Sequence, residues 1–139
     1  MLTVLDTTVV VSALLFRGRT AAVHQAVLEG RVVPLLTPAI LDEYLRVLSY
    51  PKLGLTDSDI GYLVGQEIRP WFRLLTETIP VDRWVAEDPG DDHFINAARV
   101  RPQTVLVSGD RHILRSRDTL PVTVLTVREL LDALELQSL

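Results

Sequence analysis

Acidic side chains are the residues of this chain best suited to do chemistry. Residues 87–98 read EDPGDDHFINAA, so Glu87, Asp88, Asp91 and Asp92 lie on either side of a Pro-Gly turn, directly before an expected helix. Like charges within a few ångströms raise one another's pKa and destabilise the fold unless a cation or hydrogen-bond donors neutralise them. The cluster therefore indicates a cation site, or carboxylates that cap a turn and a helix.

Two more acids follow apolar runs that predict buried strands. The run Leu2–Leu5 ends at Asp6, and the run Val105–Val107 is followed by Ser-Gly and Asp110. In α/β folds, ligands bind beyond the carboxyl ends of the strands. Asp6 and Asp110 would lie side by side if their strands are neighbours, and a helix beginning near Asp92 would bring a third acid to the same crevice. Helix capping is the alternative explanation for such acids.

A fourth acid, Glu43, lies at the margin of the apolar stripe of a helix expected over residues 38–48. It is either a solvated acid near a helix N-terminus or the residue that completes the cluster. Four converging carboxylates would be unstable without a divalent cation, and oxygen ligands in a chain without cysteine favour Mg²⁺ or Mn²⁺. Such an ion suits phosphodiester hydrolysis because it activates water and stabilises charge on the phosphate. Three arginines that follow would hold the polyanion, or simply form a solvated loop: Arg111, Arg115 and Arg117.

Capping residues and apolar periodicity predict the remaining elements. Thr37, Thr56 and Thr126 each precede an expected helix, and Pro34 predicts an irregular or edge position for the second strand. Helices are expected over residues 9–15, 20–29, 38–48, 56–69, 92–99 and 126–136, strands over 32–36 and 122–125, and a short strand or connector over 76–80. This order predicts a parallel sheet flanked by helices.

The composition narrows the class of protein. A chain of 139 residues with 47 % hydrophobic residues suits one compact domain, and the net charge of −4 argues against a general nucleic-acid binder. The longest apolar run is too short to cross a membrane, and the N-terminus lacks the basic flank of a signal peptide. We therefore expect a soluble, cytoplasmic protein without membrane association.

Four motifs resemble the PIN-domain nucleases, especially the toxins of bacterial toxin–antitoxin pairs. They read VLDTTVVVSALL, LDEYLRVLSYPKL, DPGDDHFINAA and VLVSGDRHIL, in the order and at the spacing of the family. The resemblance implies a three-layer α/β/α PIN-like fold over residues 1–139, with a central parallel sheet of four to five strands. It also implies an endoribonuclease that depends on Mg²⁺ or Mn²⁺, an RNA substrate, an antitoxin partner bound between helices, and a homodimer.

The resemblance also assigns residues. The family's acidic quartet falls on Asp6, Glu43, Asp92 and Asp110, as catalytic ligands of one or two metal ions, because an acid that begins a helix followed by a bulky residue and alanine selects Asp92 over Asp91. Two serine or threonine positions would support the quartet, and two positions depart from the common pattern. The remaining assignments are Asp88 as a further metal contributor, Asp91 as a turn residue, and Thr8 and Ser108 as supporting residues. The two departures are Thr8, where relatives commonly have asparagine or serine, and His112, where they often have a fifth acid.

Three alternatives remain at this point. A PIN domain without catalytic activity would act as an RNA-binding or protein-binding module. An aspartate-nucleophile phosphatase would need a second Asp two residues after Asp6, where Thr8 stands. A phosphoacceptor receiver domain would need a lysine near its last strand, whereas the chain's single lysine is Lys52.

Overall fold

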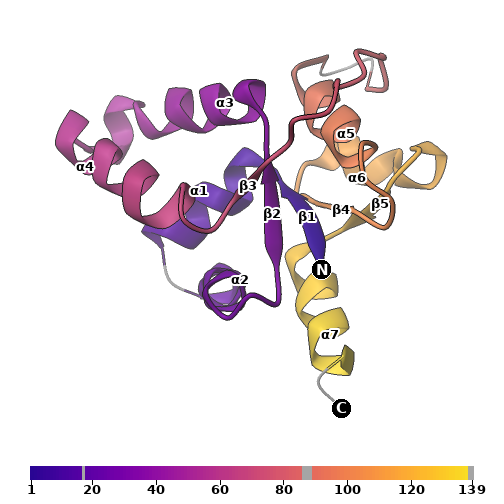
Figure 1. The fold of residues 1–139 in the computed structure, drawn as a ribbon, viewed down its shortest axis with the longest axis horizontal. Helices are drawn as coiled ribbons and strands as arrows, with labels where there is room; N and C mark the ends of the chain where they lie inside the picture. The colour runs from indigo at the N-terminus through magenta and orange to yellow at the C-terminus, as the bar shows by residue number, and fades with distance from the viewer. Residues whose placement is uncertain (17, 86–88, 138–139) are drawn as a thin grey trace.

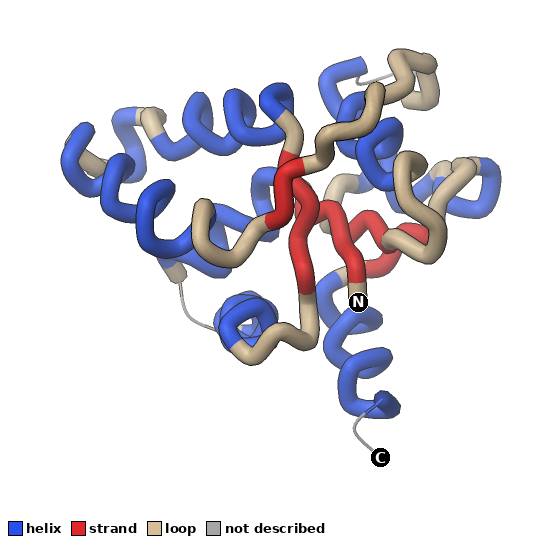
Figure 2. Tube along the Cα trace, in the orientation of Figure 1, coloured by secondary structure: helices blue, strands red, loops and turns tan. Residues whose placement is uncertain are grey.

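A parallel β-sheet organises the chain. The computed structural model describes residues 1–16, 18–85 and 89–137. The sheet has five strands in the order β3-β2-β1-β4-β5, and each neighbouring pair is parallel. Its strands are β1 (Leu2–Leu5), β2 (Val33–Leu36), β3 (Arg73–Leu74), β4 (Val105–Val107) and β5 (Thr123–Leu125). Figure 2 shows these strands as a short central sheet among the helices.

Helices cover both sides of this sheet. Figure 1 shows α1 to α4 on the left of the strands and α5 and α6 on the right, while α7 extends downward from β5. The expected three-layer α/β arrangement is therefore confirmed. The helices are α1 (Thr7–Leu15), α2 (Arg19–Leu28), α3 (Pro38–Leu48), α4 (Asp57–Tyr62), α5 (Asp92–Ala98), α6 (Arg111–Arg115) and α7 (Val127–Gln137), with a π-helical continuation of α4 over Leu63–Ile68 and short 3₁₀ turns over Pro51–Leu53, Pro89–Asp91 and Arg117–Thr119.

The two central strands bring distant parts of the chain together. Leu5 at the end of β1 lies opposite Val107 at the end of β4. The backbone N–H of Asp6 continues the ladder by donating to the Val107 carbonyl oxygen at 3.1 Å. The segments that follow both strands therefore leave the sheet side by side, as expected for the carboxyl ends of adjacent parallel strands.

β2 differs from the expectation drawn from its proline. Pro34 pairs with Thr3 of β1, whereas β3 pairs with Leu35 and Leu36. Because the β3 ladder begins after Pro34, the missing N–H of the proline disrupts no bond on that side, and β2 is an inner strand. β3 itself precedes the region expected for it, since residues 76–80 form a connector.

Helix caps follow the sequence closely. The Thr37 hydroxyl accepts from the N–H of Ile40 at 3.1 Å, and Thr56 and Thr126 each form a reciprocal capping box with the acid three residues later. Buried side chains from Val4 to Leu134 form one hydrophobic core. Within the described ranges, no helix is both long and apolar enough to span a bilayer.

Candidate functional site

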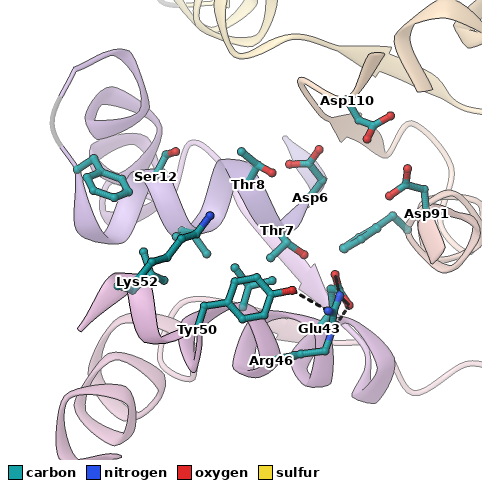
Figure 3. Close-up of a pocket in the computed structure, with 15 residues that line it drawn as sticks. Asp6, Thr7, Thr8, Ser12, Glu43, Arg46, Tyr50, Lys52, Asp91 and Asp110 are labelled. Carbon is teal, nitrogen blue, oxygen red and sulfur yellow. Dashed lines mark hydrogen bonds and ion pairs between the residues drawn. The ribbon is translucent and has the colours of Figure 1, made fainter. Parts of the chain in front are cut away.

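A cavity of about 440 Å³ opens where β1 and β4 end. Four carboxylates line it, and they come from the loops after β1 and β4, from α3, and from the turn before α5. Figure 3 shows three of them, Asp6, Asp91 and Asp110, on one side of the cavity, with Glu43 below them. The full lining is Asp6, Thr7, Thr8, Val11, Ser12, Phe16, Glu43, Arg46, Val47, Tyr50, Lys52, Leu53, Asp91, Phe94 and Asp110.

Asp6 is the most buried of the four acids, with 5 % of its surface exposed. It caps α1 by accepting from the N–H of Val9 at 3.0 Å through Oδ1, and its Oδ2 accepts from the Ser108 hydroxyl. Burial raises the pKa of the Asp6 carboxyl and the nearby Asp110 charge adds to this, while the hydrogen bonds from Ser108 and Val9 oppose it. Asp6 is thus a fixed carboxylate that would gain from a nearby cation.

Asp110 plays the same structural part for α6. Its Oδ1 accepts from the N–H groups of His112 at 2.8 Å and Ile113 at 3.2 Å, which makes it the N-cap. The N–H of Asp110 donates to the Ser108 hydroxyl oxygen at 3.0 Å. Ser108 is fully buried and therefore links the two strand-end acids through one side chain.

Glu43 is positioned by its neighbour on α3. The Tyr44 hydroxyl donates to the Leu5 carbonyl oxygen at 2.5 Å, so α3 is fastened to the end of β1. Burial and the Asp6 charge hold the pKa of Tyr44 well above its usual range, which keeps this donor protonated. The Glu43 carboxylate forms an ion pair with Arg46, whose Nη2 lies 2.7 Å from Oε1, and Arg46 also donates to the Tyr50 hydroxyl at 2.7 Å.

Asp91 and Asp92 point to different parts of the molecule. Asp91 ends the turn before α5 and lines the cavity. Asp92 begins α5, and its carboxylate accepts from the N–H of Trp84 at 3.0 Å, the N–H of Val85 at 2.8 Å and Nε of Arg83 at 3.1 Å. Asp92 is not among the described residues that line the cavity. The predicted set therefore comes together at Asp6, Glu43 and Asp110, and Asp91 is the fourth acid that the structure adds.

The phase of α5 explains this difference. Consecutive helical residues point about 100° apart, whereas residues three apart share a face. Phe94 lines the cavity three residues after Asp91, while Ile95, three residues after Asp92, is fully buried in the core. The position of Phe94 is the sequence signal that would have selected Asp91. Asp88, the further contributor proposed from the sequence, lies outside the described residues.

The basic residues at the cavity are not those expected. Arg117 pairs with Glu129 of α7 at 2.7 Å, and the described lining includes none of Arg111, Arg115 and Arg117. Arg46 and Lys52 supply its positive charge instead, and both come from the motif LDEYLRVLSYPKL. The spacing of Arg46, three residues after Glu43 on one helix, was the available signal for Arg46.

The lining suits a hard cation in its donor chemistry. Four carboxylates around one cavity provide oxygen ligands of the kind that Mg²⁺ and Mn²⁺ prefer, and the buried Asp6 carries a pKa that a cation would bring down. Within the described part of the chain, no three Asp, Glu or His side chains already converge closely enough to hold a metal ion. Hydrogen bonds to Asp6 and Asp110 and the Arg46 ion pair with Glu43 occupy part of the donor set instead.

Comparisons with known proteins agree with this architecture. A protein-family model described as the PIN domain matches residues 3–112, which include all but the first residue of β1, all of β2 to β4, and all four acids of the cavity. A comparison with curated protein sequences gives no match. The chain belongs to the PIN domain family, a family of nucleases that typically use divalent metal ions.

Proposed function

We propose that this protein is a metal-dependent endoribonuclease that hydrolyses phosphodiester bonds at the cavity beyond β1 and β4. The observation that carries the proposal is the meeting of four carboxylates from separate segments at one cavity in a PIN domain. Under this proposal Asp6, Glu43, Asp91 and Asp110 hold one or two Mg²⁺ or Mn²⁺ ions. Asp91 takes the place that the sequence hypothesis gave to Asp92.

The bound ion would supply an activated water and a positive charge at the attacked phosphate. The chain's own residues fix its ligands in place. Asp6 and Asp110 are held as helix caps and linked through Ser108, and Tyr44 fixes the helix that carries Glu43. Thr8 lines the same cavity and offers a hydroxyl to the ligands or to the RNA.

Toxin activity is the finer part of the proposal. It is supported by the four sequence motifs that resemble toxin nucleases, and it implies an antitoxin partner and a homodimer. Expression of the wild-type protein in a bacterial host should then arrest growth and cleave host RNA. The Asp6→Asn variant should do neither at equal abundance.

A catalytically inactive PIN module remains the second candidate. It is favoured by the internal partners of the acids, above all the Arg46 ion pair with Glu43. Under this alternative the cavity binds RNA or a protein without cleaving it. The two candidates differ in whether added metal produces cleaved RNA.

The deciding experiment measures RNA cleavage by purified protein with Mg²⁺, with Mn²⁺ and with a chelator. Cleavage should require metal and should be lost in Asp91→Asn, and the exposed Asp132→Asn on α7 serves as a matched control. Asn at position 6 retains an oxygen that can cap α1, so Asp6→Asn removes charge while preserving the helix start. Cleavage that persists in chelator, or equally in the Asp6 and Asp91 variants, would contradict the nuclease proposal.

A further inference from the structure

The cavity has a second end whose chemistry differs from the acidic one. Figure 3 shows Ser12, Tyr50 and Lys52 at this end, away from Asp91 and Asp110. Phe16 also lines the cavity and is bonded through its backbone N–H to the Ser12 carbonyl oxygen. We propose that this end is a subsite for one unstacked nucleotide of a single-stranded RNA, with Phe16 stacking on the base and Lys52 contacting a phosphate. The proposal rests on the nuclease function above and names the form of its substrate.

Phe16 is placed as a stacking surface. It follows the last residue of α1, and its backbone N–H donates to the Ser12 carbonyl oxygen at 2.9 Å. It lines the cavity, and 54 % of its surface is exposed. An exposed aromatic ring next to a polar site is a typical platform for a nucleic-acid base. Stacking of a base on such a ring contributes several-fold to affinity whatever the base, because every base has a π-face.

Lys52 supplies charge at the same end. It lies on the 3₁₀ turn Pro51–Leu53, directly after α3, and it is the only lysine in the sequence. Figure 3 shows its side chain running between Tyr50 and Ser12 into the cavity, opposite Asp110. Arg46, the other cation of the described lining, is bonded to Glu43 and to Tyr50. Of these two cations, Lys52 is therefore the one better placed to contact a phosphate, because Arg46 is held at a carboxylate that would repel it.

The size of the cavity favours a single strand. About 440 Å³ is near the lower end of the range for small-ligand pockets and suits about one nucleotide. A base within a duplex is stacked between its neighbours and cannot present its face to Phe16. An RNA with an unstacked base would place its phosphate at Lys52 and the adjoining phosphodiester at the acids.

The test compares binding of short fluorescent RNAs by anisotropy, in chelator, with wild-type protein and with Asp6→Asn. The RNAs are a single strand, the same strand with one abasic position moved along it, and the corresponding duplex. Wild type should prefer the intact strand to the abasic strand whose missing base falls at Phe16. Phe16→Ala should weaken binding of the intact strand about fivefold or more and remove this preference. Phe16→Trp should retain the affinity and the preference. Tyr62→Ala, at a similarly exposed aromatic residue on α4, is the matched control and should change neither.

Lys52→Gln should weaken all RNAs alike and reduce the slope of log affinity against log salt by about 0.7 to 1, with Arg128→Gln on α7 as its control. The proposal is overturned if Phe16→Ala behaves like Tyr62→Ala, if the duplex binds as well as the single strand, or if no RNA binds. Failure of the nuclease function is distinguishable, because base-dependent binding would persist without metal-dependent cleavage. If the protein cleaves RNA but Phe16→Ala binds RNA as wild type does, the subsite is contradicted and the nuclease function is not.

Discussion

The hydroxyl of Ser108, at the end of β4, donates a hydrogen bond to Oδ2 of Asp6, at the end of β1. Both side chains are buried, and the same hydroxyl oxygen accepts from the N–H of Asp110. One serine therefore links two strand-end acids and lowers the pKa of the more buried one against the effect of burial.

Replacing Ser108 by Ala should weaken metal binding at acidic pH. Loss of the donor raises the pKa of Asp6 further, so the pH profile of Mn²⁺ binding should move to higher pH. At neutral pH without metal, the loss of a buried hydrogen bond to a charged group should destabilise the fold by roughly 1–3 kcal/mol. Mn²⁺ titrations across pH and urea unfolding measure both effects. Ser49→Ala, at an exposed hydroxyl, is the control, and an unmoved profile would show that Ser108 does not tune Asp6.

Asp6→Asn should stabilise the metal-free protein at neutral pH. Because the folded state raises the pKa of Asp6, its contribution to stability is fully present below the unfolded value and is lost as pH rises through the folded value. The variant should therefore exceed wild type in free energy of unfolding at pH 7 in chelator, and the difference should vanish toward pH 3. Equal stability of wild type and Asp6→Asn at both pH values would contradict the destabilising effect of burial on this carboxylate.

Excess Mn²⁺ should reverse that order. A ligand at about 100 times its Kd stabilises the folded state by about 2.7 kcal/mol, and wild type should gain this while Asp6→Asn gains less. Thermal melts with and without Mn²⁺ provide the measurement. A gain of the same size in both proteins would place the ion elsewhere.

Asp91→Ala and Asp92→Ala should have opposite consequences. Asp92→Ala leaves the N–H groups of Trp84 and Val85 without their acceptor and should lower the free energy of unfolding by roughly 2–3 kcal/mol, yet retain stabilisation by Mn²⁺. Asp91→Ala should cost less stability and lose most of the Mn²⁺ response. Denaturant unfolding with and without metal separates the two, and a lost metal response in Asp92→Ala alone would restore Asp92 as the ligand.

Arg46→Gln should strengthen metal binding. The guanidinium lies 2.7 Å from the Glu43 carboxylate, and the Arg46 side chain is largely exposed, so its removal should free a carboxylate oxygen at little cost in stability. We expect a gain of about two- to fivefold in Mn²⁺ affinity by calorimetric titration. Arg128→Gln controls for the change in net charge, and a gain of the same size there would show that the ion pair is not responsible.

Local signals sufficed for most of the fold. Thr37, Thr56 and Thr126 mark helix starts because a capping hydroxyl acts on the next turn, and runs such as Val105–Val107 mark buried strands because few other structures bury them. Such local signals did not predict β3. It has two exposed residues, and only its pairing with β2 makes it a strand.

The site was less accessible to sequence reasoning. Asp6 and Asp110 could be placed because strand ends fix them without reference to distant contacts. The choice between Asp91 and Asp92 depends on helix phase and on residues 83–85, which supply the partners of Asp92 and carry no sequence pattern that announces them. Arg46 was missed because a basic residue near an acid on a helix is ordinarily a surface ion pair. Lys52 was missed because it lies in the turn after α3, whose position beside the cavity only the structure shows.

The pairing of β1 with β4 also determines when the acidic cluster can form during synthesis of the chain. Asp6 is made well before Ser108, its partner directly after the neighbouring strand, because 102 positions separate the two residues. A nascent chain that has not yet released β4 from the ribosome carries Asp6 and Glu43 without Asp110. The nuclease that we propose would therefore stay inactive beside the ribosomal RNA and its own messenger RNA until β4 and Asp110 have left the ribosome.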